Sequence, residues 1–172
     1  MKLISLLEKL EYTCLQGSTD QEVKNVIYDS RKVEEGSLFI CIRGAVVDGH
    51  KFVPDVVAKG AKVLIVEEAV EAPEDVTVIL VKDTRYAMAF ISAAYFGYPA
   101  EKLKTIGITG TKGKTTTTYM VKSILENAGY KVGLIGTIEA IIGDKVIPAK
   151  NTTPESYVIQ EYFHEMAEAG CD

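Results

Sequence analysis

Apolar residues follow two different patterns along the first half of the chain, a helical spacing and short continuous runs. Leucines at helical spacing between residues 3 and 10 predict an amphipathic helix at the start. Short runs rich in β-branched residues predict three buried strands, at 38–42, 63–66 and 76–81. Helices are predicted after the first and the third strand, at 51–59 and at 84–96, the latter capped by Asp83. This alternation of strands and helices indicates an α/β domain.

A turn-rich segment, Gly97-Tyr98-Pro99-Ala100, separates this pattern from the next one. We place a domain boundary there, which divides the chain into residues 1–98 and 99–172. Beyond it, a strand at 104–109, a helix at 114–128 and a strand at 132–136 predict one βαβ unit with a right-handed crossover.

The end of the chain has the pattern of a hairpin followed by a helix. The runs 138–142 and 145–149 flank Gly143-Asp144, which predicts two antiparallel strands joined by a tight turn. Thr153 is expected to cap a helix that has Pro154 in its first turn and that runs to about residue 169.

Composition narrows the class of protein. The 172 residues are 47% hydrophobic and 25% charged, as in an ordinary globular protein. The net charge of −5, with no long basic run, argues against broad nucleic-acid binding. Cys14, Cys41 and Cys171 are far apart and odd in number, so we expect neither a disulfide framework nor a zinc site, and we predict a cytoplasmic setting. No apolar stretch is long enough to span a membrane.

One loop carries the clearest candidate chemistry. The run from Gly107 to Thr118 lies between a predicted strand and a predicted helix, which is the layout of a phosphate-binding loop. Glycines let backbone N–H groups turn toward phosphate oxygens, and the helix directs its positive end at the anion. Lys114 would reach the β- and γ-phosphates of a nucleoside triphosphate, and the Thr115 hydroxyl would bind Mg²⁺. The residues expected to bind the nucleotide are Gly110, Thr111, Lys112, Gly113, Lys114, Thr115 and Thr116.

The loop departs from the general phosphate-loop motif at one position. The motif has its first glycine where this chain has Ile108, and glycines stand at 107 and 110 instead. A glycine-rich turn with an exposed lysine is the alternative interpretation. The Gly-Lys-Thr sequence in a strand-to-helix context favours a nucleotide site.

Several motifs together resemble the Mur ligase family, the ATP-dependent enzymes that form amide bonds in peptidoglycan precursor synthesis. The shifted glycine of the loop is typical of that family. The other motifs are Asp29-Ser30-Arg31, Gly36 to Ile40, Asp48 to Phe52, Gly133 to Thr137 and Asn151 to Ser156. They occur in order over nearly the whole chain after residue 23, and they are similar to the member that adds the third residue of the stem peptide.

The resemblance implies a uridine-nucleotide-binding domain followed by the start of a phosphate-loop ATPase-like central domain. The implied reaction joins meso-diaminopimelate or L-lysine to UDP-N-acetylmuramoyl-L-alanyl-D-glutamate, with ATP and Mg²⁺, through an acyl phosphate. Lys114 would be the catalytic residue, because phosphoryl transfer depends on positioning and charge neutralisation. Family members continue far beyond Asp172, so we expect this chain to be an amino-terminal fragment that is inactive alone, and a monomer.

The resemblance also implies which residues bind the nucleotide sugar: Ser30, Asn151, Thr152 and Thr153. For Ser30 there is a structural alternative, in which Asp29 and Arg31 pair with each other in a polar turn. The Thr153 hydroxyl is also expected to cap a helix, and the two roles compete, so Thr152 is the stronger ligand candidate. The segment Ala45-Val46-Val47 aligns with a uridine-contacting segment whose side chains differ here, which leaves backbone contacts.

Other interpretations stay open. The chain could be another Mur-type ligase or a folate polyglutamate ligase, although the Asp-Ser-Arg and Asn-Thr-Thr-Pro motifs favour the third-residue enzyme. It could also be a stand-alone nucleotide-binding module without ligase chemistry. Lys112 stands where family members usually carry Asn, which adds positive charge beside the phosphates. His50 and His164 have no partner cysteine or carboxylate at metal spacing in the sequence, so we expect neither to be catalytic.

Overall fold

The computed structural model describes residues 1–44 and 47–172. The chain divides into two compact units, Met1–Tyr95 and Phe96–Asp172, and each is described by itself. Close to this division, Gly97 and Tyr98 both have positive φ, 72° and 53°. The 3₁₀ turn η3 Pro99–Lys102 follows.

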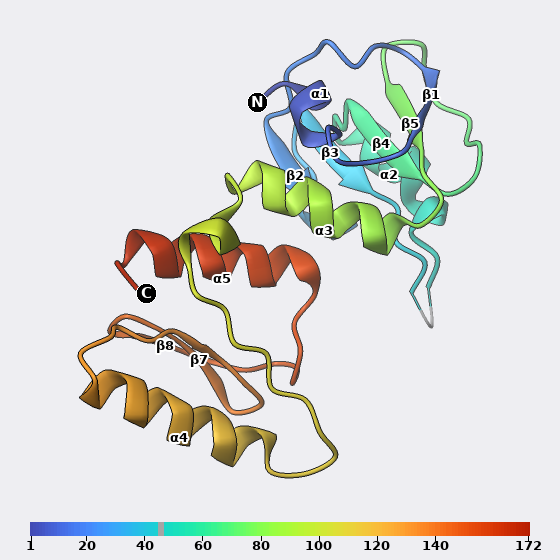
Figure 1. Cartoon of the computed structure of the whole chain (residues 1–172). Coiled ribbons are helices and arrows are strands. Elements are labelled where there is room, and N and C mark those ends of the chain that lie inside the picture. Colours follow the sequence, from blue (N-terminus) through green and yellow to red (C-terminus); the bar gives the residue numbers. More distant parts are fainter. Residues whose placement is uncertain (45–46) are drawn as a thin grey trace. The chain divides into compact units, whose positions relative to one another are not determined.

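The first unit is built on a five-stranded sheet in the order β1-β5-β4-β3-β2 (Figure 1). Its strands are β1 Thr13–Gln16, β2 Asn25–Ile27, β3 Ser37–Ile40, β4 Val63–Val66 and β5 Thr77–Leu80. Strands β2 to β5 pair in parallel, and β1 pairs antiparallel with β5. All residues of β3 and β4 are buried, as in strands covered on both faces. The carboxyl ends of the four parallel strands therefore lie along one edge of the sheet.

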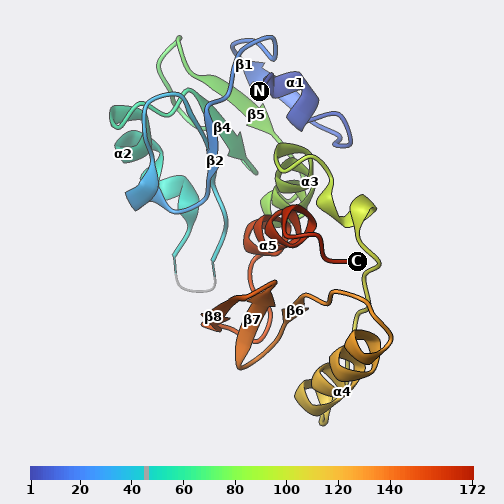
Figure 2. The same cartoon turned by 90° about the vertical axis from the view of Figure 1, so that its left-hand side faces the viewer.

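Helices cover both faces of this sheet (Figure 2). The 3₁₀ turn η2 Gly49–Phe52 leads into α2 Val53–Ala58, which buries Val53 and Val56 against one face. On the other face lie α1 Leu3–Leu6 and α3 Thr84–Tyr95, which contact each other. Because both faces are covered, the strands carry apolar side chains at successive positions, and this is the continuous apolar pattern seen in the sequence.

The predicted elements of this unit are confirmed, although α1 is shorter than expected and two strands, β1 and β2, were not predicted. The β-branched runs form β3, β4 and β5, and Asp83 caps α3 by accepting the Tyr86 N–H at 2.9 Å. The sequence pattern misses β1, because three of its four residues are exposed and show no apolar alternation. Hydrogen bonds hold its end instead, with the Gln16 side chain donating to the Pro73 and Val76 carbonyls at 2.6 and 2.8 Å.

The second unit holds a three-stranded antiparallel sheet of β6 Leu134–Ile135, β7 Glu139–Ile142 and β8 Lys145–Pro148. The predicted hairpin is confirmed, with Gly143 at a φ of 56° in its turn. Helix α5 Ser156–Glu168 contacts β7 and buries Met166. Helix α4 Lys114–Asn127 has no buried residue, and the Tyr119 hydroxyl ties it to the Glu139 carboxylate of β7 at 2.6 Å.

The prediction of a parallel βαβ unit is wrong for the structure observed here. Residues 104–110 form no strand, and β6 pairs with β7 alone. At one end of the two segments that were expected to pair, the main chain of Asp172 contacts both. The Lys104 N–H donates to the Asp172 carbonyl at 2.7 Å, and the Asp172 N–H donates to the Lys131 carbonyl at 2.9 Å. Along their length the two segments line a cleft instead of pairing with each other.

The prediction that Thr153 caps the last helix is also wrong. Helix α5 begins at Ser156, with Glu155 as the flanking residue and no side-chain cap. Residues 151–153 form bends and residues 154 and 155 have no regular structure, so the helix starts three positions after Thr153. The competition between two roles for the Thr153 hydroxyl therefore disappears.

Candidate nucleotide-binding site

The phosphate-loop segment enters α4 through a left-handed glycine. Gly113 precedes the helix with a φ of 79°, and Gly110 has a φ of 152°. A side chain at Gly113 would be strained, so the turn depends on glycine. The Lys114 ammonium folds back over the loop and donates to the Gly110 carbonyl at 2.7 Å. This contact keeps the cation at the helix N-terminus, where anions are favoured.

A cleft of about 720 Å³ opens beside this loop in the second unit. It is lined by the segments 103–110 and 130–137 and by residues of α4 and α5. Five of the residues predicted to bind ligands line it: Gly110, Lys114, Thr115, Thr152 and Thr153. The structure thus brings the phosphate loop and the Asn-Thr-Thr segment, which are about forty positions apart in sequence, to one cleft.

The other predicted ligand residues of this unit lie outside the lining of the cleft. Thr111, Lys112, Gly113, Thr116 and Asn151 are all exposed. The cleft also contains residues that the sequence did not single out for ligand binding, notably Gly136 and Thr137, which follow β6. Their position directly after an apolar run is the sequence feature that marks them, because ligand sites gather where strands end.

The lining of the cleft is chemically mixed. Lys114, Thr115, Thr152 and Thr153 line it together with apolar residues, among them Leu134 and Met166, which are buried, and Ile106, which is 62% exposed. Lys104, Lys122 and Lys131 also line the cleft, so its cationic side chains are not confined to the loop.

Ser30 lies in the first unit, at the carboxyl end of β2. It opens the 3₁₀ turn η1 Ser30–Lys32, and its carbonyl accepts from the Lys59 ammonium at 3.0 Å. The alternative pairing of its neighbours is present: Arg31 Nη2 and Asp29 Oδ2 are 2.7 Å apart, and Arg31 Nε and Asp29 Oδ1 are 2.8 Å apart. The hydrogen bonds from Arg31 hold the pKa of Asp29 at about 2, below the ordinary 3.8. These two hydrogen bonds, called the Arg31–Asp29 fork below, fix the turn that presents Ser30. The pairing of Arg31 with Asp29 is therefore compatible with ligand binding by Ser30.

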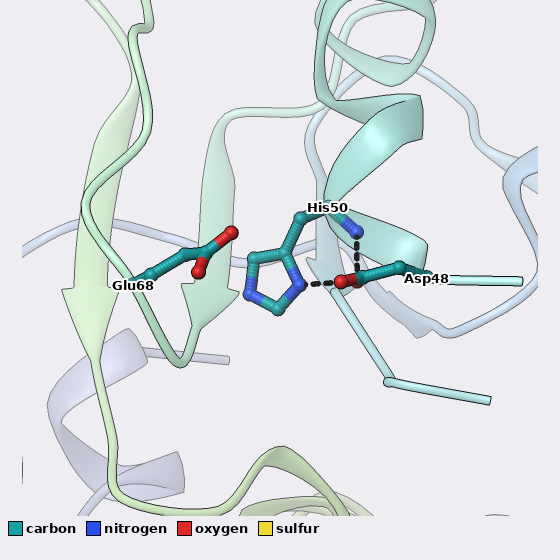
Figure 3. A group of neighbouring side chains, drawn as sticks. All are labelled: Asp48, His50 and Glu68. Atoms are coloured by element: carbon teal, nitrogen blue, oxygen red, sulfur yellow. Dashed lines mark hydrogen bonds and ion pairs between the residues drawn. The ribbon is translucent and has the colours of Figure 1, made fainter. Parts of the chain in front are cut away.

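A second polar cluster lies at the same edge of the sheet. Asp48, His50 and Glu68 place one ligand-type atom each within 4.8 Å of one another, with Asp48 and Glu68 on opposite sides of the imidazole (Figure 3). His50 is therefore not a lone histidine, as the sequence suggested. Both ring nitrogens are nevertheless engaged: Nδ1 lies 2.6 Å from Asp48 Oδ1, and Nε2 accepts the Glu67 N–H at 2.9 Å. Arg43 pairs with both carboxylates, so the cluster offers no open ligand set for a metal ion.

The segment predicted to contact uridine through its backbone, residues 45–47, lies mostly outside the described residues. Val47 is described and is 49% exposed. His164, in α5, contacts the Phe96 ring at a centroid distance of 5.6 Å. Among the residues that the structure covers, no helix has both the length and the apolar character that crossing a membrane requires.

Sequence comparison places these features in a known class. The description "Mur ligase family, catalytic domain" matches residues 22–96, and "Mur ligase middle domain" matches residues 108–172. The chain belongs to the Mur ligase family, and its fold is α/β, with the amino-terminal domain of that family followed by the first part of the middle domain.

Sequence identity to individual relatives supports this assignment. The chain is 52% identical over 172 residues to the UDP-N-acetylmuramoyl-L-alanyl-D-glutamate--2,6-diaminopimelate ligase of Clostridium perfringens, covering 100% of this chain and 36% of that enzyme. It is 47% identical over 175 residues to the ligase of the same name from Clostridium tetani. A solved structure of such a diaminopimelate ligase matches with a TM-score of 0.76 at 22% identity, over 99% of this chain and 34% of that one. This last likeness concerns the fold alone. The chain thus spans about a third of the length of the relatives it matches.

Proposed function

We propose that the chain forms the substrate-anchoring and phosphate-binding part of an ATP-dependent ligase that adds 2,6-diaminopimelate to UDP-N-acetylmuramoyl-L-alanyl-D-glutamate in peptidoglycan synthesis. The observation that carries the proposal is the meeting of Lys114, Thr115 and Thr152 in one cleft of a Mur ligase chain. The choice of diaminopimelate over L-lysine rests on the names of the relatives alone. The three cysteines are free, which accords with the cytoplasmic setting that we propose for this chemistry.

Each unit has its own part in this proposal. In the first unit, Ser30 and the neighbouring carboxyl edge of the sheet hold the uridine nucleotide, since ligands of open parallel sheets bind at that edge. In the second unit, backbone N–H groups of the loop and the Lys114 ammonium hold the phosphates of ATP. Thr152 and Thr153 face the same cleft and orient the sugar and the peptide carboxylate.

The proposed reaction proceeds through two substitutions. The substrate carboxylate attacks the γ-phosphorus of ATP and forms an acyl phosphate with release of ADP. The amine of the incoming amino acid then attacks the acyl carbon, and phosphate leaves. Lys114 neutralises charge on the transferred phosphoryl group, which is the main demand of such a step. To do so its ammonium exchanges the Gly110 carbonyl for phosphate oxygens.

Mg²⁺ fits one residue of this chain. The Thr115 hydroxyl lies in the cleft at the start of α4, which is the position from which a phosphate-loop threonine binds the metal. When bound, Mg²⁺ would supply charge neutralisation between phosphate oxygens, and it commonly takes only one or two protein ligands.

The proposal is tested by NMR titration of the 172-residue chain. Addition of ATP with Mg²⁺ is expected to shift backbone resonances from Gly107 to Thr118 and at Thr152. Addition of UDP-N-acetylmuramoyl-L-alanyl-D-glutamate is expected to shift Ser30 and its neighbours. Shifts from ATP confined to the first unit, or none from either ligand at millimolar concentration, would contradict the proposal.

A further inference from the structure

Helix α4, which begins with Lys114 and Thr115, is attached to the sheet of the second unit by a single side-chain hydrogen bond. The helix buries no residue, so packing does little to fix its position. The Tyr119 hydroxyl lies 2.6 Å from Oε1 of Glu139, the first residue of β7. Within the described part of the chain, every other side-chain hydrogen bond of α4 stays inside the helix or reaches the loop before it.

The contact between Tyr119 and Glu139 has the geometry of a charge-assisted hydrogen bond. A phenol donates its proton to a carboxylate, and such O–H···O⁻ bonds are typically about 2.5–2.7 Å long. The observed distance lies in this range, and both side chains are half-buried. The hydrogen bond to Glu139 raises the pKa of the Tyr119 hydroxyl above its ordinary value of 10.0, because a phenolate could no longer donate.

The Glu139 end of this bond belongs to the paired part of the second unit. Strand β7 pairs with β6 on one side and with β8 on the other, where Glu139 is opposite Pro148. The Glu139 carbonyl also accepts the Gly136 N–H at 3.0 Å, which closes the turn between β6 and β7. Gly136 and Thr137 lie in this turn and line the cleft. Through Glu139, Tyr119 therefore connects α4 to a second group of cleft-lining residues.

The Tyr119 end of the bond is close to the proposed phosphate ligands. Tyr119 follows Thr115 by four residues, which is about one turn or 6 Å along the helix. Residues four apart lie on the same side of a helix. Thr115 and the adjacent Lys114 both line the cleft. The hydrogen bond therefore holds α4 by its first turns, where these two residues lie, rather than by its distant end.

We infer that Tyr119 is a positioning residue for nucleotide binding, which uses Glu139 to hold the first turns of α4 against the turn after β6. The inference rests on the proposed function, since it takes the loop and the cleft as the ATP site. Tyr119 does not line the cleft, so it acts through Lys114 and Thr115 rather than by touching the nucleotide. Without the contact, α4 would spend a smaller fraction of time in the binding-competent position, and the apparent dissociation constant rises in inverse proportion to that fraction.

The first test asks whether the contact forms in solution. A ¹³C NMR titration of the tyrosine Cζ atoms reports the pKa of each hydroxyl, and Tyr119→Phe assigns the resonance of Tyr119. We expect Glu139→Gln to lower the pKa of Tyr119 toward 10.0, because the amide is uncharged. An unchanged Tyr119 pKa in this variant would overturn the inference.

The second test compares affinity for ATP with Mg²⁺ among variants of the 172-residue chain by isothermal titration calorimetry. Tyr119→Phe keeps the ring and removes only the hydroxyl, and it is expected to weaken binding about three- to tenfold, the effect of one ordinary hydrogen bond. Glu139→Ala should have the same effect, and the double variant should lose no more than either single one, because both remove the same contact. Glu139→Gln should recover part of the loss, since its amide oxygen still accepts.

Asn127→Ala is the matched control in the same helix. It removes the hydrogen bond from the Asn127 amide to the Ser123 carbonyl, which stays inside α4, and Asn127 does not line the cleft. We expect it to leave ATP affinity unchanged. If it weakens ATP binding as much as Tyr119→Phe does, Tyr119 only stabilises the helix and the inference fails.

The remaining outcomes separate the inference from the proposed function. If Tyr119→Phe binds ATP as the wild type does, or if the losses in the double variant add, the inference fails and the proposed function stands. If the wild type itself does not bind ATP, the proposed function of the loop fails, and the inference fails with it.

Discussion

The two units of this chain bury their apolar residues to very different degrees. In the first unit, β3 and β4 are wholly buried between helices. Among the described residues of the second unit, only Leu134, Ala140, Ile142 and Met166 are buried hydrophobic residues. Its helix α4 leaves Met120 and Ile124 more than 60% exposed. The unit that we assign to the uridine nucleotide therefore has a full core, whereas the phosphate loop sits on a sparsely packed scaffold.

In this chain, which spans about a third of its relatives' length, the binding motif keeps its local geometry although α4 buries no residue. The phosphate loop has its glycines, its lysine and its helix N-terminus in place, although α4 contributes nothing to a buried core. Local rules such as positive φ at glycine set the shape of the loop. The stability of an element comes instead from burial of its apolar face, which α4 lacks here.

The largest contrast is expected from truncating one apolar side chain in each unit. Leu64→Ala, in the core of the first unit, should lower the free energy of unfolding by about 2–5 kcal/mol, because it leaves a cavity. Ile124→Ala, at a residue 67% exposed, should change it by less than about 0.5 kcal/mol. Urea denaturation of both variants measures the difference. Equal losses would contradict the claim that the two units differ in the burial of their apolar residues.

A substitution in the phosphate loop is expected to have a smaller effect, and it acts on the free energy of ATP binding. Lys114→Ala should weaken ATP binding about ten- to hundredfold, since a hydrogen bond to a charged group contributes about 1.5–3 kcal/mol. Lys145→Ala is the control, because this lysine of β8 pairs with Glu165 and does not line the cleft. Isothermal calorimetry compares the two. Similar ATP affinity in both variants would remove Lys114 from the site.

Substitution of the residues proposed to bind the nucleotide sugar should lower the affinity for that ligand selectively. Ser30→Ala and Thr152→Ala are each expected to weaken binding of the UDP-sugar dipeptide about three- to tenfold and to leave ATP affinity unchanged, since each removes one hydrogen bond. Titration of each variant with both ligands decides the matter. A parallel loss of affinity for both ligands would indicate a folding defect rather than a binding role.

The smallest effect concerns the fork beside Ser30. In the folded state, hydrogen bonds from Arg31 lower the pKa of Asp29 to about 2. A depressed carboxyl pKa stabilises the fold above about pH 4, and this contribution disappears as the pH falls through about 2. Arg31→Gln should therefore return the Asp29 pKa toward 3.8, which a ¹³C NMR titration of the carboxyl measures. An unchanged pKa would show that the fork does not form in solution.

The first unit was largely predictable because its strands are short, β-branched and bounded by turns. What the pattern could not supply there was β2, which is only three residues long, and β1, whose exposed residues are held by hydrogen bonds from Gln16 rather than by burial. In the second unit the local elements α4, β7 and β8 were predictable, but the pairing of 104–109 was not. Pairing depends on which segments meet in space, and these two line a cleft, with Asp172 bonded to both at one end.

The candidate site was predictable from the sequence only where a single motif determines the local backbone shape. The phosphate loop could be recognised from Gly113-Lys114-Thr115. Thr152 was named only through the family resemblance, and its meeting with the loop in one cleft was not predicted. The bridge made by His50 was hidden, because Glu67 contributes its backbone N–H and no side-chain pattern reports that contact. Which residues a cleft contains, such as Gly136 and Thr137, also follows from tertiary packing alone.

Hydrogen–deuterium exchange along the whole chain tests most directly the claim that a well-packed unit is joined to a sparsely packed phosphate-loop unit. Backbone amides in β3 and β4 are expected to exchange slowly, near the rate of global unfolding. Amides in α4 and β6 to β8 are expected to exchange faster by at least an order of magnitude, through local opening. Uniform protection on both sides of Phe96 would contradict the account.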